Sequence, residues 1–490
     1  MQQLTGGDAL FLKVEMDNFP MHIGGVSIYD QSTAPGGKVR FKELLKLFES
    51  RLHLSPIFRR KLMDAPMKMD QPYWIDDENF DLEFHVHHIA LPKPGDWRQL
   101  CILVARLHAR ALDRGRPLWE AYVIEGLNNV DGVPKGSFAV YMKAHHCALD
   151  GVTGVKFFGA INDLTAKPEK IKDIPEWTPE PKPSSTQLLT RAYRNRLRRR
   201  SDLFKMVGQM GAARKRLKHA KESEVYRDIG EVPSTRFNGP ISSHRIVDAV
   251  KFDFEAVRTI KNTVPGATIN DAVLAIVSGA MRSYLDAHNE LPEESLVTGC
   301  PIDVRDESNR ESGGNMIGMM NVSLCSDIED PFDRLVAIHD ATNSAKHTAE
   351  ALGPSIGMEV AETVPTGIQS AVIRLAVGAG LSESNVMMNT IVTNVPGSPV
   401  QLYLHGARQV DAIGIGPVAP GTGLFHTVNS LVLNKKGSIM IGFVACRDLM
   451  PDPEFYAQCL RESFDQLRSA CIKKAGKRAK KAKKKPRASA

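Results

Sequence analysis

The sequence predicts a mixed α/β protein made of two globular halves that are joined by a basic connector. Three observations support this prediction. The 490 residues exceed the size at which a single hydrophobic core keeps growing. Short strand-like runs alternate with longer runs of helical period in both halves. A Pro-rich break at 174–185 is followed by an arginine-rich stretch. We predict an N-terminal domain over 1–178, a connector over 179–232, a C-terminal domain over 233–472 and a disordered Lys-rich tail over 473–490.

The N-terminal half contains clear strand and helix patterns. The run HIGGVSIYD (22–30) is typical of a strand, and FKELLKLFESRL (41–52) has its apolar residues at helical spacing. The run SFAVYMK (137–143) alternates, with Phe138 on one face and Ala139 on the other. We therefore expect a strand that ends at the two histidines after Lys143, followed by a helix over 152–164.

The C-terminal half repeats this mixture. Residues 268–285 (TINDAVLAIVSGAMRSYL) have a polar start and an apolar body, which predicts a helix. Residues 295–305 and 389–397 are expected to form buried strands. Residues 426–446 are typical of a hairpin, and we place its turn at Lys435, Lys436 and Gly437.

Charge is distributed unevenly along the chain. The net charge of +7 becomes −3 when the ten Lys and Arg of 473–490, a stretch without acids, are left out. A nucleic-acid function is therefore not expected for the body, although the Lys-rich tail would attract any polyanion. Seven scattered cysteines without a CxxC pair favour a reducing compartment. No secretory signal and no apolar run of about 18 residues is apparent, so we expect a cytoplasmic protein with at most peripheral membrane contact.

The connector contains a basic amphipathic stretch at 186–227, for which two interpretations stay open. Apolar residues recur along one side of it, and arginines occupy most other positions. The stripe either packs on one domain, as in a solvated linker, or it contacts a membrane surface. The residues of this stripe are Leu189, Tyr193, Leu197, Phe204 and Val207.

The segment KAHHCALDG places two histidines four and five residues before an aspartate. This arrangement suits a general base with its orienting partner, a set of metal ligands or a packed corner without chemistry. On an extended strand His146 shares the apolar face and His145 points to the opposite side, which argues against a shared metal ion. The same divergence argues against an ion pair of Cys147 with the neighbouring histidine. No phosphate-binding or dinucleotide-binding glycine motif is present.

These residues carry a resemblance to a known family. HHCALDG resembles the HHxxxDG motif of the CoA-dependent acyltransferase superfamily, and the whole globular body is similar to the bacterial bifunctional wax ester synthase/acyl-CoA:diacylglycerol acyltransferases. Further matching stretches are GGDALFLKVE, PMHIGGVSIYD, RPLWEAYVIEGL, INDAVLA, TNVPGSP and GPVAPGTGL. The resemblance implies two chloramphenicol-acetyltransferase-like domains, each a mixed sheet flanked by helices, with the active site in a channel between them.

The resemblance also implies roles for individual residues. His146 is the general base, and Asp150 holds the loop by pairing with Arg305. Asn270 either donates to the oxyanion or caps its helix, so both of its roles stay open. The resemblance implies no metal and no cofactor. Acyl-CoA is counted as a substrate and not as a cofactor. The residues assigned to the site are His145, His146 and Asp150 as catalytic; Asn270, Asp271 and Arg305 as support; and Pro117, Leu118, Trp119 and Gly151 as lining of the substrate channel.

The function that follows is acyl transfer from acyl-CoA to a long-chain alcohol, to diacylglycerol or to both, without an acyl-enzyme. Expected partners are these substrates and the surface of an anionic membrane or lipid inclusion. Two alternatives differ in class. One is a relative that acylates another hydroxyl or an amine, and the other is a non-catalytic protein that binds lipid surfaces.

Overall fold

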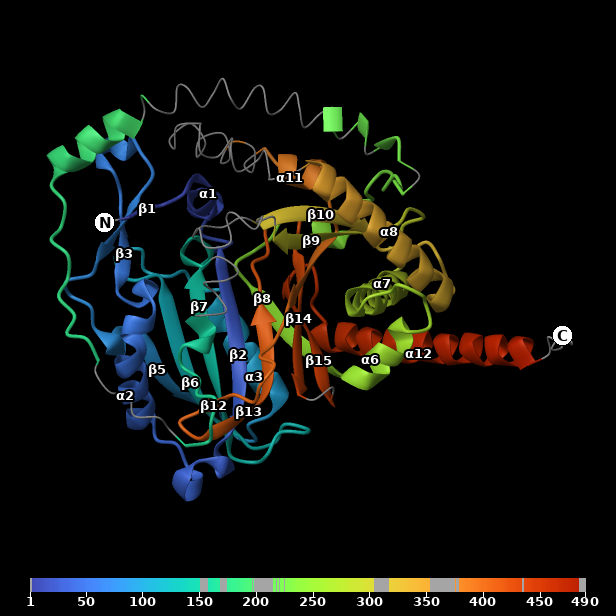
Figure 1. Ribbon diagram of the computed structural model, residues 1–490, viewed down its shortest axis with the longest axis horizontal. Coiled ribbons are helices and arrows are strands. Elements are labelled where there is room, and N and C mark those ends of the chain that lie inside the picture. The colour runs from blue at the N-terminus through green and yellow to red at the C-terminus, as the bar shows by residue number, and fades with distance from the viewer. Residues whose placement is uncertain are drawn as a thin grey trace, which may run out of the picture.

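The computed structural model contains two six-stranded mixed sheets that are flanked by helices (Figure 1). It describes residues 2–149, 157–167, 174–195, 225–303, 317–352, 379–433 and 436–483, together with a few single positions between them. The mixed α/β class and the two-domain architecture predicted from the sequence are confirmed.

The first sheet has the strand order β12-β13-β2-β7-β6-β5. The strands β2 (His22–Asp30), β7 (Ser137–His145) and β6 (Trp119–Leu127) pair antiparallel, and β5 (Val86–Ala90) runs parallel to β6. Both faces of β7 are buried, which explains why its sequence is mostly apolar. Helix α2 (Phe41–Arg51) covers one face and α3 (Trp97–His108) covers the other. A small sheet, β1-β4-β3, lies beside them and consists of Gln2–Gln3, Tyr73–Asp76 and Arg60–Met63.

The second sheet has the order β10-β9-β11-β14-β15-β8. Its strand β11 is parallel to β9 and β14, and the remaining pairs are antiparallel. The bounds are Arg245–Asp253 for β8, Val297–Asp303 for β9, Ile317–Ser323 for β10, Thr390–Val395 for β11, Leu424–Leu433 for β14 and Lys436–Cys446 for β15. Lys436 and Gly437 belong to β15 rather than to the turn that we predicted, and Lys435 lies outside the described residues.

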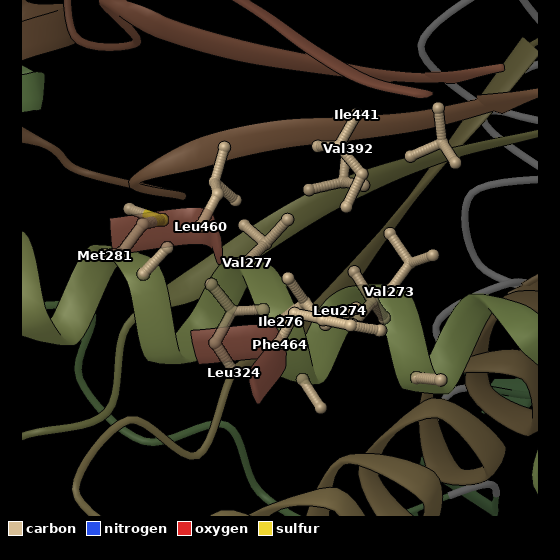
Figure 2. Close-up of a cluster of buried hydrophobic side chains, with 14 of the residues drawn as sticks. Val273, Leu274, Ile276, Val277, Met281, Leu324, Val392, Ile441, Leu460 and Phe464 are labelled. Atoms are coloured by element: carbon tan, nitrogen blue, oxygen red, sulfur yellow. The ribbon is translucent and has the colours of Figure 1, made fainter. Parts of the chain in front are cut away.

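Four helices pack on the second sheet. These are α6 (Phe254–Lys261), α7 (Ile269–Ala287), α8 (Pro331–Leu352) and α12 (Pro453–Lys483). Figure 2 shows the core between them, where Val273 and Val277 of α7 lie beneath Val392 and Ile441 of the sheet. The short helix α11 (Leu381–Ser384) precedes β11.

Two strands of the C-terminal half belong to the N-terminal sheet. The strands β12 (Tyr403–Leu404) and β13 (Ala407–Ile415) extend the first sheet, because β13 pairs antiparallel with β2. The sheets therefore do not follow the predicted division of the chain at 178 and 233. The two halves also share a hydrophobic core, in which Ile28 and Ile413 of the first sheet contact residues such as Val247 and Val444 of the second.

The C-terminal helix extends beyond the boundary that we predicted. The tail was expected to be disordered from residue 473, but α12 continues to Lys483. Lys474 lies over the Phe332 ring and 3.3 Å from the Asp333 carboxylate, which ties this turn of the helix to α8. Among the described residues, no helix is both long enough and apolar enough to cross a bilayer.

Candidate functional site

The two histidines lie where β7 gives way to a single 3₁₀ turn at His146–Ala148. The His145 N–H donates to the Leu118 carbonyl at 3.0 Å, and the His146 N–H donates to the Met21 carbonyl at 2.9 Å. The strand therefore ends at the histidines, as the sequence predicts. Because the turn begins at His146, this residue leaves the pleat that would have placed it on the apolar face of β7.

Both ring nitrogens of His145 are engaged. Its Nδ1 accepts the N–H of Cys147 at 3.1 Å, so in the neutral ring the proton is on Nε2. That Nε2–H donates to Oε2 of Glu15 at 2.9 Å. His145 is almost fully buried and has no basic nitrogen left for a substrate proton. It orients the turn rather than taking part as the base.

Glu15 follows helix α1 (Gly6–Val14) and was not singled out from the sequence. Burial alone would raise the pKa of this carboxyl, but hydrogen bonds from His145, the Met21 N–H and Arg114 lower its pKa to about 2. Glu15 is therefore ionised at neutral pH and fixes the tautomer of His145. Because 130 positions separate the two residues, no local pattern could have linked them.

His146 is half-buried and lies flat against Phe11 of α1, with ring centroids 3.9 Å apart and planes 8° apart. Burial, with a smaller contribution from His145, lowers the pKa of His146 to about 4. The imidazole is therefore neutral at physiological pH, which is the form that accepts a proton.

Cys147 is buried beside Leu4, Ala9 and Leu118. Burial raises the pKa of its thiol well above the usual range, so the sulfur stays protonated and is a poor nucleophile. Within the described part of the chain, no group of three His, Cys, Asp or Glu is arranged to hold a metal ion. His85 donates from Nδ1 to the Trp119 carbonyl at 2.8 Å and stacks on the Trp119 ring.

A buried polar cluster lies behind His145. The Tyr141 hydroxyl and the His108 Nδ1 are 2.9 Å apart, and the His22 ring lies edge-on to the rings of both His108 and His145. The ammonium of Lys143 is fully buried and lies 3.1 Å from the Glu120 carboxylate. Burial lowers the pKa values of His22 and His108, the latter to about 3, so both rings are neutral at pH 7.

Pro117, Leu118 and Trp119, which follow Arg116 in the stretch RPLWEAYVIEGL, have a structural role here. Leu118 and Trp119 are completely buried, and the indole N–H of Trp119 donates to the Phe58 carbonyl at 3.1 Å. Pro117 is buried as well. The side chains of Leu118 and Trp119 therefore belong to the core, and the channel-lining role implied by the resemblance stays a prediction. Their contribution to the site is the Leu118 carbonyl that holds His145.

Asn270 and Asp271 lie in the first turn of α7. Thr268 is the cap residue, because its hydroxyl accepts the Asp271 N–H at 3.2 Å while Asp271 accepts the Thr268 N–H at 2.8 Å. The capping role considered for Asn270 is therefore wrong. Asp271 is buried and also contacts Nδ1 of His339 at 3.0 Å, which makes it a structural residue. Asn270 is half-buried, and its role as an oxyanion donor stays a prediction. Asp150, Gly151 and Arg305 lie outside the described residues.

A cavity of about 470 Å³ opens where the two sheets meet, between α3, the start of β8 and the segment before α12. We refer to it as the α3–β8 groove. Its lining does not include His145 or His146, so the channel expected between the domains stays a prediction. The residues that line the groove are Trp97, Arg98, Cys101, Ile102, Ala105, Arg106, Ala109, Arg110, Ser243, His244, Arg245, Ile246, Val247, Asp248, Arg447, Pro451, Pro453 and Glu454.

Two family models match the chain. Residues 4–273 match the wax ester synthase/diacylglycerol acyltransferase catalytic domain, and residues 313–468 match the C-terminal domain of the same family. The two matches together span both halves of the fold.

Known proteins are similar over nearly the whole chain. A Mycobacterium tuberculosis H37Rv protein with the name "Probable diacyglycerol O-acyltransferase" is 30% identical, over 96% of this chain and 99% of its own. A second protein of that strain, with the name "Putative diacyglycerol O-acyltransferase", is 33% identical over 95% of this chain and 91% of its own. The structure of a wax ester synthase/diacylglycerol acyltransferase from Marinobacter aquaeolei VT8 is similar, with a TM-score of 0.67 and 23% identity. The match covers 96% of this chain and 100% of that one. The starter condensation domain of rhizomide synthetase shares the fold, with a TM-score of 0.54, 13% identity and coverage of 96% and 94%.

Proposed function

Because this chain belongs to the wax ester synthase/diacylglycerol acyltransferase family, we propose that it is an O-acyltransferase that moves a long-chain acyl group from CoA to a fatty alcohol, to diacylglycerol or to both. The observation that carries this proposal is the pair of histidines at the end of β7, in which His145 is fully engaged and His146 is a neutral imidazole.

His146 acts as the general base in this proposal. A hydroxyl is too weak an acid to ionise by itself at neutral pH, so its proton passes to His146 as the oxygen attacks the thioester carbonyl. The tetrahedral oxyanion then collapses, the C–S bond breaks, and the departing CoA thiolate takes the proton from His146. An ester and free CoA result, and no acyl-enzyme forms. The protonated thiol of Cys147 is consistent with direct transfer.

Product analysis tests this function. Purified protein is supplied with palmitoyl-CoA and hexadecanol, diacylglycerol or a long-chain amine, and thin-layer chromatography then separates wax ester, triacylglycerol and amide. We expect esters, and we expect His146→Ala to reduce the rate by about 10²- to 10⁴-fold. An amide as the main product would favour acylation of another acceptor. A His146→Ala protein that is folded and retains about a tenth of the activity or more would exclude the histidine as the base.

We also propose that the protein meets its water-insoluble substrates at a lipid surface. Residues 185–195 are helical and bury Leu188 against Tyr73. The described residues of the predicted apolar stripe do not pack closely on a domain, because Leu189, Tyr193 and Leu197 are 36%, 63% and 50% exposed. Phe204 and Val207 lie outside the described residues. Thirteen Lys and Arg against three acids over 191–227 would add attraction to anionic headgroups.

A further inference from the structure

The α3–β8 groove concentrates positive charge in a body whose net charge is negative without the tail. Five arginines line it, and only two acids do. One acid, Glu454, pairs with Arg98, and the other, Asp248, accepts the indole N–H of Trp97 at 2.7 Å. The three remaining exposed arginines form no ion pair with any residue that the structure describes. They are Arg106, Arg110 and Arg447.

Arg245 adds a buried cation to the same groove. Its guanidinium donates to the backbone carbonyls of Ser242, His244 and Asn18, and within the described chain it has no carboxylate partner. Burial of a guanidinium without an anion is costly, so an anionic ligand in the groove would offset part of that cost. Burial also lowers the pKa of Arg245, as expected for a cation without a counterion.

The end of the groove beside the start of α3, away from Arg106 and Arg110, is suited to a flat aromatic ring. Trp97, Cys101, Ile102 and Ala105 form an apolar wall along α3, whereas Arg106 lies one turn after Ile102 on the same helix and Arg110 lies two residues beyond its end. A ligand that places an aromatic base against the first set and phosphates against the second matches this order. The volume of about 470 Å³ is within the range of small-molecule sites.

The cationic end of the groove also lies close to the histidine turn. The Lys143 ammonium donates to the carbonyls of Leu107 and Arg110 at 3.0 and 2.8 Å, and Lys143 is two residues before His145 on β7. On the other side, Arg245 holds the carbonyl of Asn18, three residues before the Met21 carbonyl that binds the His146 N–H. Contacts on both sides of the groove therefore lead to the segments that hold the histidine turn.

We propose that the α3–β8 groove binds the phosphorylated adenine-nucleotide end of the acyl donor, with the adenine against Trp97 and the phosphates on Arg106, Arg110, Arg245 and Arg447. This assignment rests on the proposed function, which supplies CoA as the donor. Its phosphates provide the anion that Arg245 lacks, and its pantetheine arm extends from the groove toward His146.

Binding without turnover tests the proposal. The full chain is titrated by calorimetry with 3′,5′-adenosine bisphosphate, with dephospho-CoA and with inorganic phosphate. The triple variant Arg106→Gln/Arg110→Gln/Arg447→Gln should weaken nucleotide binding by about tenfold or more, since tenfold corresponds to about 1.4 kcal/mol. In turnover assays the KM for palmitoyl-CoA should rise toward that for palmitoyl-pantetheine, which lacks the nucleotide. Arg468→Gln, an exposed arginine of α12 outside the groove, is the matched control and should keep wild-type values.

Two results would overturn the assignment. One is equal nucleotide affinity in the wild type and in the triple variant. The other is inorganic phosphate binding as tightly as the nucleotide, which would make the groove a site for free phosphate. The outcome for the groove is separable from that for the reaction. Nucleotide binding that depends on the arginines but occurs without acyl transfer would uphold the groove and remove the proposed function, whereas transfer with an unchanged KM in the variant would do the reverse.

Discussion

The Glu15–His145 pair gives a quantitative prediction for the histidine turn. The variant Glu15→Gln keeps the size of the side chain and one acceptor oxygen but removes the charge. In the folded protein the pKa of Glu15 is about 2, against 4.5 for an unperturbed glutamate. At about 1.4 kcal/mol per pKa unit, the ionised carboxylate contributes about 3 kcal/mol to the free energy of unfolding. We expect Glu15→Gln to lose at most this amount at pH 7.

The pH dependence follows from the direction of the shift. Because the folded-state pKa of Glu15 is depressed, its contribution is fully present above pH 4.5 and is lost as the pH falls toward 2. The difference in stability between wild type and Glu15→Gln should therefore be constant from pH 7 to about 5 and should shrink below that. Urea unfolding at a series of pH values measures it. Arg114 contributes less than His145 to the stabilisation of the Glu15 carboxylate, since half of its side chain is exposed and solvent screens its charge.

Activity provides a second test of the same pair. Without the carboxylate charge, the hydrogen bond that holds the His145 Nε2–H is weaker, so the turn that carries His146 is less well oriented. We expect kcat to fall more than KM rises. Asp17→Asn, an exposed carboxylate two residues away, is the matched control and should change neither stability nor kcat. A Glu15→Gln protein with wild-type stability at pH 7 and wild-type kcat would refute the positioning role.

Two further predictions concern the thiol and the lipid surface. Cys147→Ala should retain most activity, and the wild-type enzyme should resist N-ethylmaleimide at pH 7, because burial keeps the Cys147 thiol protonated; a trapped acyl-cysteine would contradict direct transfer. Replacing Leu189, Tyr193 and Leu197 by Ser should reduce vesicle binding that persists at high salt, whereas removing 477–490, which carries eight Lys and Arg, should weaken only the salt-sensitive part. Co-sedimentation with anionic vesicles at low and high salt measures the salt-sensitive and the salt-resistant binding. Unchanged binding in either variant would show that the altered segment does not contact the membrane.

Local patterns predicted the elements well. The run 22–30 is β2, 137–143 lies within β7, and 268–285 is α7 with a difference of one residue at its start and two at its end. Each of these is specified by residues that are neighbours in sequence, through alternation or helical period. The partner of a strand is not specified in this way. The pattern of 407–415 is that of a half-buried strand whichever sheet it joins, so its pairing with β2 could not be predicted.

The connector shows a second limit of periodicity. Leu188 and Ala192 form one apolar row and Leu189 and Tyr193 form the next, so the helix has two adjacent rows that could face the protein. The structure buries the first row, against Tyr73, and exposes the second. The choice depends on the surface that the helix meets, which lies more than a hundred positions away in the chain. The exposed row is the one we had selected.

The histidine turn depends on both halves of the molecule through the crossing strand. Immediately after β13, the Gly416 carbonyl lies 3.2 Å from Nε2 of His108, and the other nitrogen of that ring is bonded to Tyr141. Within β13, the Gly414 N–H donates to Asn429 of β14 at 2.6 Å. The polar cluster behind His145 is thus joined by hydrogen bonds to the second sheet. Because Arg245 at the start of β8 holds the segment before β2 from the other side, movement of one sheet against the other would displace both the groove and the histidines. Donor binding in the α3–β8 groove, as we propose it, would therefore be coupled to the orientation of His146 by the same few contacts.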